Sequence, residues 1–275
     1  MRYLRLASIL IFIASLLFAV LSNIYYYSKR NSDRPVITSD TALLKISTAD
    51  GEEGLLQGLK AYDATDGDIT EKIMVASVSH FIAENTANVK YVVFDAHNNS
   101  ATLTRKVEYT DYKAPVFKLL KSPVYTKGDR FDLSDYVKAQ DCVDGDITDK
   151  IRVISNNVSN YSAGTYPIIF EVSNSFGDKA QLEVMVTYLD SKSTVSIKLH
   201  EYAVYINKGD SFNPQEWLAS VTDENNNVLD KEKVSVLGNL DTNTEGSYQL
   251  NYSYDDGSKK GMASLTVIVK GDKNG

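Results

Sequence analysis

The chain has 275 residues, of which 43% are hydrophobic and 24% charged, a composition typical of folded proteins and unlike that of disordered ones. Its formal net charge of −7 argues against a nucleic-acid partner or a general anionic-membrane surface, since both require clustered Lys and Arg. The single cysteine, Cys142, excludes an intrachain disulfide and a zinc site built of thiolates.

The first predicted element is a membrane helix at Leu6–Tyr27, a run without any charged residue. At 1.5 Å per residue it reaches about 33 Å, enough to cross a hydrocarbon core of about 30 Å. Residues 1–5 would be a cytoplasmic stub and residues 28–34 a juxtamembrane linker. Five residues are too few to fold, so we expect a single-pass cell-membrane protein, a signal-anchor, with its C-terminal domains outside the cytoplasm.

The alternative for the same segment is a signal peptide that is removed. No A-x-A site follows the apolar run, but Val20-Leu21-Ser22 is a passable substitute with a small residue at the cleavage position. The protein would then be secreted. Under either interpretation most of the chain leaves the cytoplasm.

After this segment the sequence repeats itself with a period of about 80 residues. Asp63–Ile73 reappears as Asp141–Ile151, and Lys127–Asp132 reappears as Lys208–Asn213. Ala163-Gly-Thr-Tyr166 is echoed by Glu245-Gly-Ser-Tyr248. Several matches in the same order predict three tandem modules, here named repeat 1 (35–110), repeat 2 (111–189) and repeat 3 (190–271), with linkers near 110–114 and 189–194.

Each repeat shows the alternation of apolar and polar residues that is typical of half-buried strands. Leu182, Val184, Val186 and Tyr188 alternate in repeat 2, as do Leu265, Val267 and Val269 in repeat 3. Short strands separated by Gly, Asn and Asp turns predict an all-β fold. We therefore expect three tandem Ig-like β-sandwich domains preceded by a single transmembrane helix.

These motifs resemble a bacterial immunoglobulin-like domain of uncharacterised function that also occurs in a pesticidal crystal toxin and is related to hyalin-type repeats. Repeat 2 carries most of the marks of that family: Lys113-Ala-Pro-Val-Phe117, Lys127-Gly-Asp-Arg-Phe131, Asp141–Thr148 and Gly164-Thr-Tyr166. Repeat 1 lacks the second and fourth marks, and repeat 3 has Thr222–Val228 in place of the third. The resemblance implies an Ig-like fold and a surface location, and no reaction. A bacterial source agrees with the lack of a cysteine pair.

The acidic motif is the candidate site. Its carboxylates could gather around Ca²⁺, which takes six to eight oxygen ligands. The alternative is turn chemistry, because Asp bonds its own backbone and Gly67 and Gly145 supply positive φ. The spacing also lacks the later Glu of a twelve-residue calcium loop. The candidate ligands are Asp63, Asp66, Asp68, Asp141, Asp144 and Asp146.

No catalytic residues or cofactor are predicted. The three histidines, His80, His97 and His200, lie in different repeats without a paired spacing, and no nucleophile or phosphate-binding motif occurs. The expected function is that of a non-enzymatic, membrane-anchored stalk or adhesion-type surface protein with a protein or cell-wall glycan partner. The alternative is an accessory or sensor ectodomain that binds a glycan, a peptide or Ca²⁺.

Overall fold

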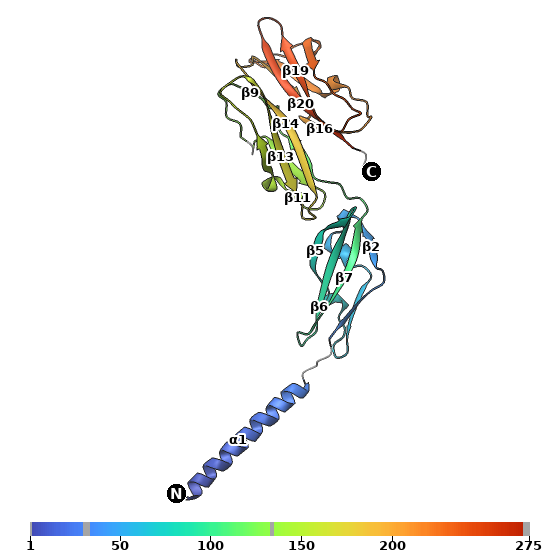
Figure 1. The fold of residues 1–275 in the computed structure, drawn as a ribbon, viewed down its shortest axis with the longest axis vertical. Coiled ribbons are helices and arrows are strands. Elements are labelled where there is room, and N and C mark those ends of the chain that lie inside the picture. Colours follow the sequence, from blue (N-terminus) through green and yellow to red (C-terminus); the bar gives the residue numbers. More distant parts are fainter. Residues whose placement is uncertain (1, 30–33, 133–134, 272–275) are drawn as a thin grey trace. The chain divides into compact units, whose positions relative to one another are not determined.

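The computed structural model describes residues 2–29, 34–132 and 135–271 (Figure 1). The chain divides into two compact units, Met1–Asp111 and Tyr112–Gly275. Unit 1 contains the N-terminal helix and repeat 1, and unit 2 contains repeats 2 and 3. Residues 30–33 of the predicted juxtamembrane linker lie outside the described residues.

The N-terminal segment forms one helix, α1 (Arg2–Lys29), which includes the predicted membrane span. Within the residues that the structure describes, no helix combines the length and the hydropathy needed to cross a membrane. The predicted transmembrane segment Leu6–Tyr27 is therefore not confirmed.

Repeat 1 consists of two sheets with the strand orders β1-β3-β4 and β2-β7-β6-β5. Two short helical elements, η1 and α2, lie between β2 and β3, and a 3₁₀ turn, η2, follows β4. The bounds are β1 (Val36–Ser39), β2 (Leu43–Ile46), η1 (Thr48–Asp50), α2 (Gly51–Leu55), β3 (Leu59–Asp63), β4 (Gly67–Asp68), η2 (Thr70–Lys72), β5 (Met74–Ala83), β6 (Thr86–Phe94) and β7 (Ser100–Tyr109).

Repeat 2 has the same plan, with the orders β8-β10-β11 and β12-β13-β14-β9. Its elements are β8 (Val116–Leu119), β9 (Val124–Thr126), β10 (Val137–Asp141), β11 (Gly145–Asp146), η3 (Thr148–Lys150), β12 (Arg152–Asn156), β13 (Gly164–Ser173) and β14 (Lys179–Leu189).

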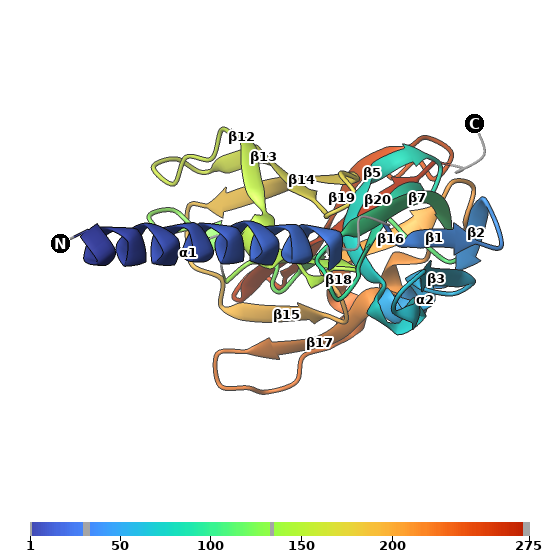
Figure 2. The same ribbon diagram turned by 90° about the horizontal axis from the view of Figure 1, so that it is seen from below.

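Repeat 3 pairs β15 with β17 and orders its larger sheet β16-β20-β19-β18. Figure 2 shows β15 and β17 side by side. The elements are β15 (Val195–Leu199), β16 (Ala203–Asn207), η4 (Pro214–Trp217), β17 (Leu218–Asp223), η5 (Lys231–Lys233), β18 (Val234–Leu237), β19 (Gly246–Asp255) and β20 (Lys260–Lys270).

All three repeats share one topological feature. In the larger sheet, an early strand pairs in parallel with the last strand of the repeat, as β2 with β7, β9 with β14 and β16 with β20. The neighbouring pairs in these sheets are antiparallel. The structure thus confirms the all-β prediction, and the two-sheet pattern occurs three times along the described chain.

The cores use the inward faces that the alternation predicts. In repeat 2, Phe117 and Leu119 of β8 pack with Phe170 of β13 and Val184 of β14, so both sheets contribute to one cluster. The apolar residues that alternate in β14 are all buried. Burial of both inner faces is what makes each pair of sheets a sandwich.

Repeats 2 and 3 are joined directly inside unit 2. Ala203 and Ile268 of repeat 3 pack against the core of repeat 2. The backbone N–H of Phe117 donates to Oη of Tyr205 at 2.8 Å, and the N–H of Ser264 donates to Oγ of Ser122 at 2.7 Å. The predicted linker 189–194 therefore lies between two repeats that also contact each other elsewhere.

Repeat 1 has one buried cation, and no Lys or Arg is buried among the described residues of the other repeats. Arg105 of β7 is 3% exposed, and the register of the last hairpin places it where repeat 2 has the core residue Val184. Its guanidinium donates to the carbonyls of Leu55 at 2.7 Å and Gln57 at 2.8 Å. These carbonyls end α2, so Arg105 satisfies acceptors that a helix C-terminus leaves open.

Candidate functional site

In repeat 2 the acidic motif begins where β10 ends. Oδ1 of Asp141 accepts the backbone N–H groups of Val143 and Asp144, each at 2.9 Å. Gly145 follows with φ of 71°, a conformation that disfavours residues with a side chain. This is an Asp-closed turn of the kind that the sequence favours, and it leads the chain into β11.

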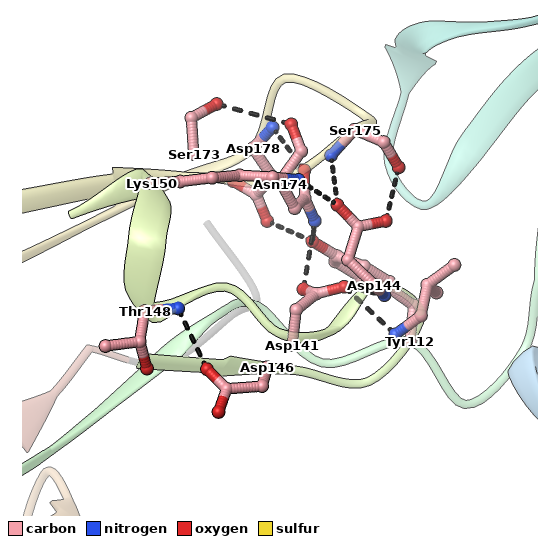
Figure 3. Close-up of polar contacts among 11 residues, drawn as sticks. Tyr112, Asp141, Asp144, Asp146, Thr148, Lys150, Ser173, Asn174, Ser175 and Asp178 are labelled. Carbon is pink, nitrogen blue, oxygen red and sulfur yellow. Dashed lines mark hydrogen bonds and ion pairs between the residues drawn. The ribbon is translucent and has the colours of Figure 1, made fainter. Parts of the chain in front are cut away.

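The second oxygen of Asp141 is bonded to another loop. Oδ2 accepts Nδ2 of Asn174 at 3.0 Å, from the turn between β13 and β14 (Figure 3). Nδ2 of Asn174 also donates to Oη of Tyr112 at 2.7 Å, and Oη of Tyr112 donates to Asp178 at 2.7 Å. Burial, together with this bond to Asp178, raises the pKa of Tyr112 well above its ordinary value. The phenol therefore stays protonated and remains a donor.

The other two aspartates of the motif point elsewhere (Figure 3). Asp144 accepts the N–H of Ser175 at 2.8 Å, the hydroxyl of Ser175 at 2.6 Å and Nζ of Lys150 at 2.9 Å. Burial alone would raise the pKa of Asp144, but these bonds outweigh it and lower the pKa. Asp146 accepts the N–H of Thr148 at 2.9 Å. The three carboxylates thus have three separate sets of partners.

Repeat 1 reproduces the turn. Oδ1 of Asp63 accepts the N–H groups of Thr65 and Asp66, each at 2.9 Å, and Asp68 accepts that of Thr70 at 2.9 Å. Asp66 reaches the opposite turn and accepts the N–H of Ala96 at 2.6 Å. One difference stands out: Oδ2 of Asp63 is buried and has no hydrogen-bond partner. The whole residue is only 1% exposed.

The residue of repeat 1 that corresponds to Asn174 is Asp95, the first residue after β6. Its Oδ1 accepts the N–H groups of His97 at 2.8 Å and Asn99 at 2.7 Å, and its Oδ2 accepts Nδ2 of Asn99 at 2.7 Å. Burial raises the pKa of Asp95, but the bonds from Asn99 and His97 prevail and lower it. Asp95 is 5% exposed and charged at neutral pH.

Repeat 3 builds the same turn from other residues. Oδ1 of Asp223 at the end of β17 accepts the N–H groups of Asn225 at 2.9 Å and Asn227 at 3.0 Å. Asn226 has φ of 61°, so an asparagine adopts the left-handed conformation that glycine provides in the other repeats. Oδ2 of Asp223 accepts Nζ of Lys259 at 2.6 Å. This bond is the main reason why the pKa of Asp223 lies well below its usual range.

The six predicted calcium ligands are therefore placed in two equivalent turns. There their side chains accept hydrogen bonds from backbone N–H groups. Among the described residues, no three His, Cys, Asp or Glu side chains lie together so that they could hold a metal ion. Calcium binding by the six aspartates remains a prediction. Turn chemistry accounts for every bond that Oδ1 of Asp63 and Oδ1 of Asp141 make.

Sequence reasoning missed the residues that face the strand-end aspartates. These are Asn174 in repeat 2 and Lys259 in repeat 3, and Asp95 holds the corresponding position in repeat 1. Each stands in the turn before the last strand of its repeat. That shared position is the signal that could have identified them.

Comparison with known proteins agrees with this architecture. The family model described as bacterial surface protein, Ig-like domain, matches residues 121–187 and 198–269, together about half of the chain. Over 225 residues the chain is 31% identical to the pesticidal crystal protein Cry22Aa of Bacillus thuringiensis. The aligned region covers 78% of this chain and 30% of that protein. The chain thus spans less than a third of this relative.

Solved structures give weaker similarity. A structure of the M60 catalytic domain with two CBM51 domains from Clostridium perfringens ZmpB is 11% identical, with a TM-score of 0.25, and covers 88% of this chain and 31% of that one. Drosophila N-cadherin EC1-3 is 10% identical, with a TM-score of 0.29, and covers 84% and 98%. Surface layer protein SbsC, domains 4–9, is 14% identical, with a TM-score of 0.21, and covers 86% and 50%. Scores this low support no conclusion about function.

Proposed function

Because this chain belongs to the family of bacterial surface Ig-like domains, we propose that it is a non-enzymatic surface protein of the adhesion type. Its repeats act as a spacer that withstands tension and holds a binding partner away from the cell. The partner is a protein or a cell-wall glycan. The family implies the surface location, and the topology of the repeats supports the mechanical role.

The supporting observation is the parallel pairing of an early strand with the last strand in each repeat. In a parallel pair, the N-terminal end of the first strand and the C-terminal end of the last lie at opposite ends of the ladder. A force that pulls the two chain ends apart therefore loads the hydrogen bonds of the ladder in shear, all together rather than one after another. Such a pair resists extension.

In every repeat a backbone bond extends the C-terminal end of this ladder, donated by the early strand in repeats 2 and 3 and by the last strand in repeat 1. The N–H of Lys127 donates to the carbonyl of Leu189 at 2.8 Å in repeat 2, and that of Lys208 donates to Lys270 at 3.0 Å in repeat 3. In repeat 1 the N–H of Thr110 donates to Ile46 at 2.9 Å across the same pair of strands. A terminal bond at this end of the parallel pair in all three repeats favours a load carried along the chain.

Single-molecule stretching of the full chain tests the proposal. Lys127→Pro removes the donor of the terminal bond in repeat 2, whereas Lys127→Ala keeps it and serves as the matched control. We expect one of the unfolding events to move to a lower force in the proline variant only. Equal unfolding forces for the proline and alanine variants would show that the parallel pair does not bear the load.

Anchoring is the part of the proposal that rests on the sequence alone. We propose that Leu6–Tyr27, which carries no charge, retains the protein at the cell membrane. Fractionation of cells should then find the protein with the membranes. N-terminal sequencing of the mature protein that starts at Asn23 would instead identify a cleaved signal peptide and a secreted protein.

A further inference from the structure

One corner recurs in all three repeats and differs in its charge. It consists of the strand-end aspartate (Asp63, Asp141 or Asp223) and the residue from the turn before the last strand (Asp95, Asn174 or Lys259). In repeat 2 the aspartate faces an amide donor at 3.0 Å. In repeat 3 it faces an ammonium group at 2.6 Å. In repeat 1 the residue at the corresponding position, Asp95, is a second carboxylate.

Matching bonds set the orientation of the facing residue. Oδ1 of Asn174 accepts the N–H of Asp178, four residues later, at 3.0 Å. Oδ1 of Asp95 accepts the N–H of Asn99, also four residues later, at 2.7 Å. The remaining side-chain atom of Asp95 is therefore an oxygen at the position where Asn174 presents its donor nitrogen. An oxygen cannot donate to Oδ2 of Asp63, which explains why that atom has no partner.

The corner of repeat 1 thus holds two buried carboxylates: Nδ2 of Asn99 donates to Oδ2 of Asp95, whereas Oδ2 of Asp63 receives no donor. A buried charge without a partner is strongly unfavourable, and buried charges in proteins are paired or coordinate metals. Carboxylate oxygens favour a hard cation, and Ca²⁺ tolerates irregular coordination completed by water and carbonyl oxygens.

We propose that repeat 1 binds one Ca²⁺ ion between Asp63 and Asp95. The ion occupies the place that the amide of Asn174 takes in repeat 2 and the ammonium of Lys259 takes in repeat 3. Two carboxylates are fewer than a tight calcium site uses, so we expect a dissociation constant on the order of 10⁻⁴ to 10⁻³ M, as in extracellular modules. Such a site would be filled outside the cell. The proposal is independent of the mechanical role.

Calorimetric titration of the full chain with CaCl₂, at constant ionic strength, tests this site. The wild-type chain should bind one Ca²⁺. Asp95→Asn recreates the amide of repeat 2 and should weaken the binding at least about tenfold. Glu71→Gln removes an exposed carboxylate of the neighbouring turn η2, outside the candidate ligands, and should leave binding unchanged.

The reciprocal variant extends the test to repeat 2. Asn174→Asp gives that corner two carboxylates, so the chain should then bind a second Ca²⁺. Thermal unfolding of each variant, with Ca²⁺ and with a chelator, shows whether it is folded. Asp95→Asn should melt at the same temperature in both conditions, whereas the wild-type chain should melt higher with Ca²⁺.

Two results would overturn the proposal. One is a wild-type chain that takes up no Ca²⁺ at millimolar concentration, which would leave a buried water as the occupant of the corner. The other is equal Ca²⁺ binding by the wild-type chain and the folded Asp95→Asn variant, which would place the ion elsewhere. Parallel titrations with MgCl₂ and NaCl distinguish Ca²⁺ from cations in general. Neither negative result bears on the stretching experiment.

Discussion

Asp141 in repeat 2 and Asp223 in repeat 3 stand at the same strand end and close the same turn, yet their second oxygens meet different groups. Asn174 offers Asp141 a neutral amide within a network that includes Tyr112, whereas Lys259 offers Asp223 a full positive charge. One backbone shape therefore tolerates different chemistry at this corner. What it requires is a group that can satisfy a buried oxygen.

The largest expected effect comes from removing the shared aspartate. Asp141→Ala removes the side-chain acceptor of two backbone N–H groups and leaves Nδ2 of Asn174 with one partner fewer in a buried place. We expect the free energy of unfolding of unit 2 to fall by about 3 kcal/mol. Urea denaturation measures it. The exposed neighbour variant Asp149→Ala is the control, and a loss as small as the control's would mean that the turn does not depend on the carboxylate.

The two junctions between repeats should also differ. At the first, Tyr112 is 7% exposed, and the N–H of Lys113 donates to Sγ of Cys142 at 3.3 Å. At the second, Lys192 is exposed and outside any strand. Limited trypsin digestion should therefore cut after Lys192 at least about tenfold faster than after Lys113. Lys192→Gln should abolish the first cut, while Lys113→Gln should not. Earlier cleavage after Lys113 would contradict the contacts at the first junction.

A smaller effect is expected where the turn meets its own strand. Oγ1 of Thr148 accepts the N–H of Ala139 at 3.2 Å, and Thr70 accepts that of Ala61 at 3.0 Å in repeat 1. Thr148→Val keeps the shape and removes the acceptor, so it should lower the free energy of unfolding by about 1 kcal/mol. Thr148→Ser keeps the hydroxyl and should recover most of the loss in the same urea measurement. Equal losses in Val and Ser variants would point to packing instead.

The smallest expected effect is a shift in the acid unfolding of repeat 3. The folded-state pKa of Asp223 is lowered, first by Lys259, so its contribution to stability is present above the unfolded pKa of about 3.9 and lost as the pH falls toward the folded value. In Lys259→Met that pKa should rise, and unfolding should begin at higher pH. Circular dichroism between pH 5 and about pH 2 follows the transition. Lys260→Met, which breaks an exposed pair with Asp255, should leave the midpoint unchanged.

Much of the architecture was predictable because it is written in local patterns. Alternating apolar residues predicted the strands that became β14 and β20, and the repeated motif predicted the turns. The substitution of Asn226 for a glycine was also predictable, since asparagine tolerates positive φ. The family resemblance is confirmed for repeats 2 and 3, which the family model matches.

Other features were beyond the sequence. The interpretation of three independent modules missed the direct contacts between repeats 2 and 3, such as the bond from Phe117 to Tyr205 across 88 positions of the chain. It also missed Arg105, because a charged residue in an alternating strand gives no sign of whether it faces the core or the solvent. Its buried position depends on the carbonyls of α2, which only the packed fold brings to it.

The sequence by itself determined the strand alternation and the turns, because each depends on residues within about ten positions of one another. The recurrence of the turn motifs then gave the repeat length. The tertiary structure alone decided which group faces each strand-end aspartate. Asp141 and Asn174 are 33 positions apart. They meet only because the pairing of β10 with β11 and of β13 with β14 brings two turns to the same end of the sandwich. Whether a buried carboxylate there finds an amide, an ammonium group or another carboxylate follows from that register, since hydrogen bonding and charge pairing act only at contact distance.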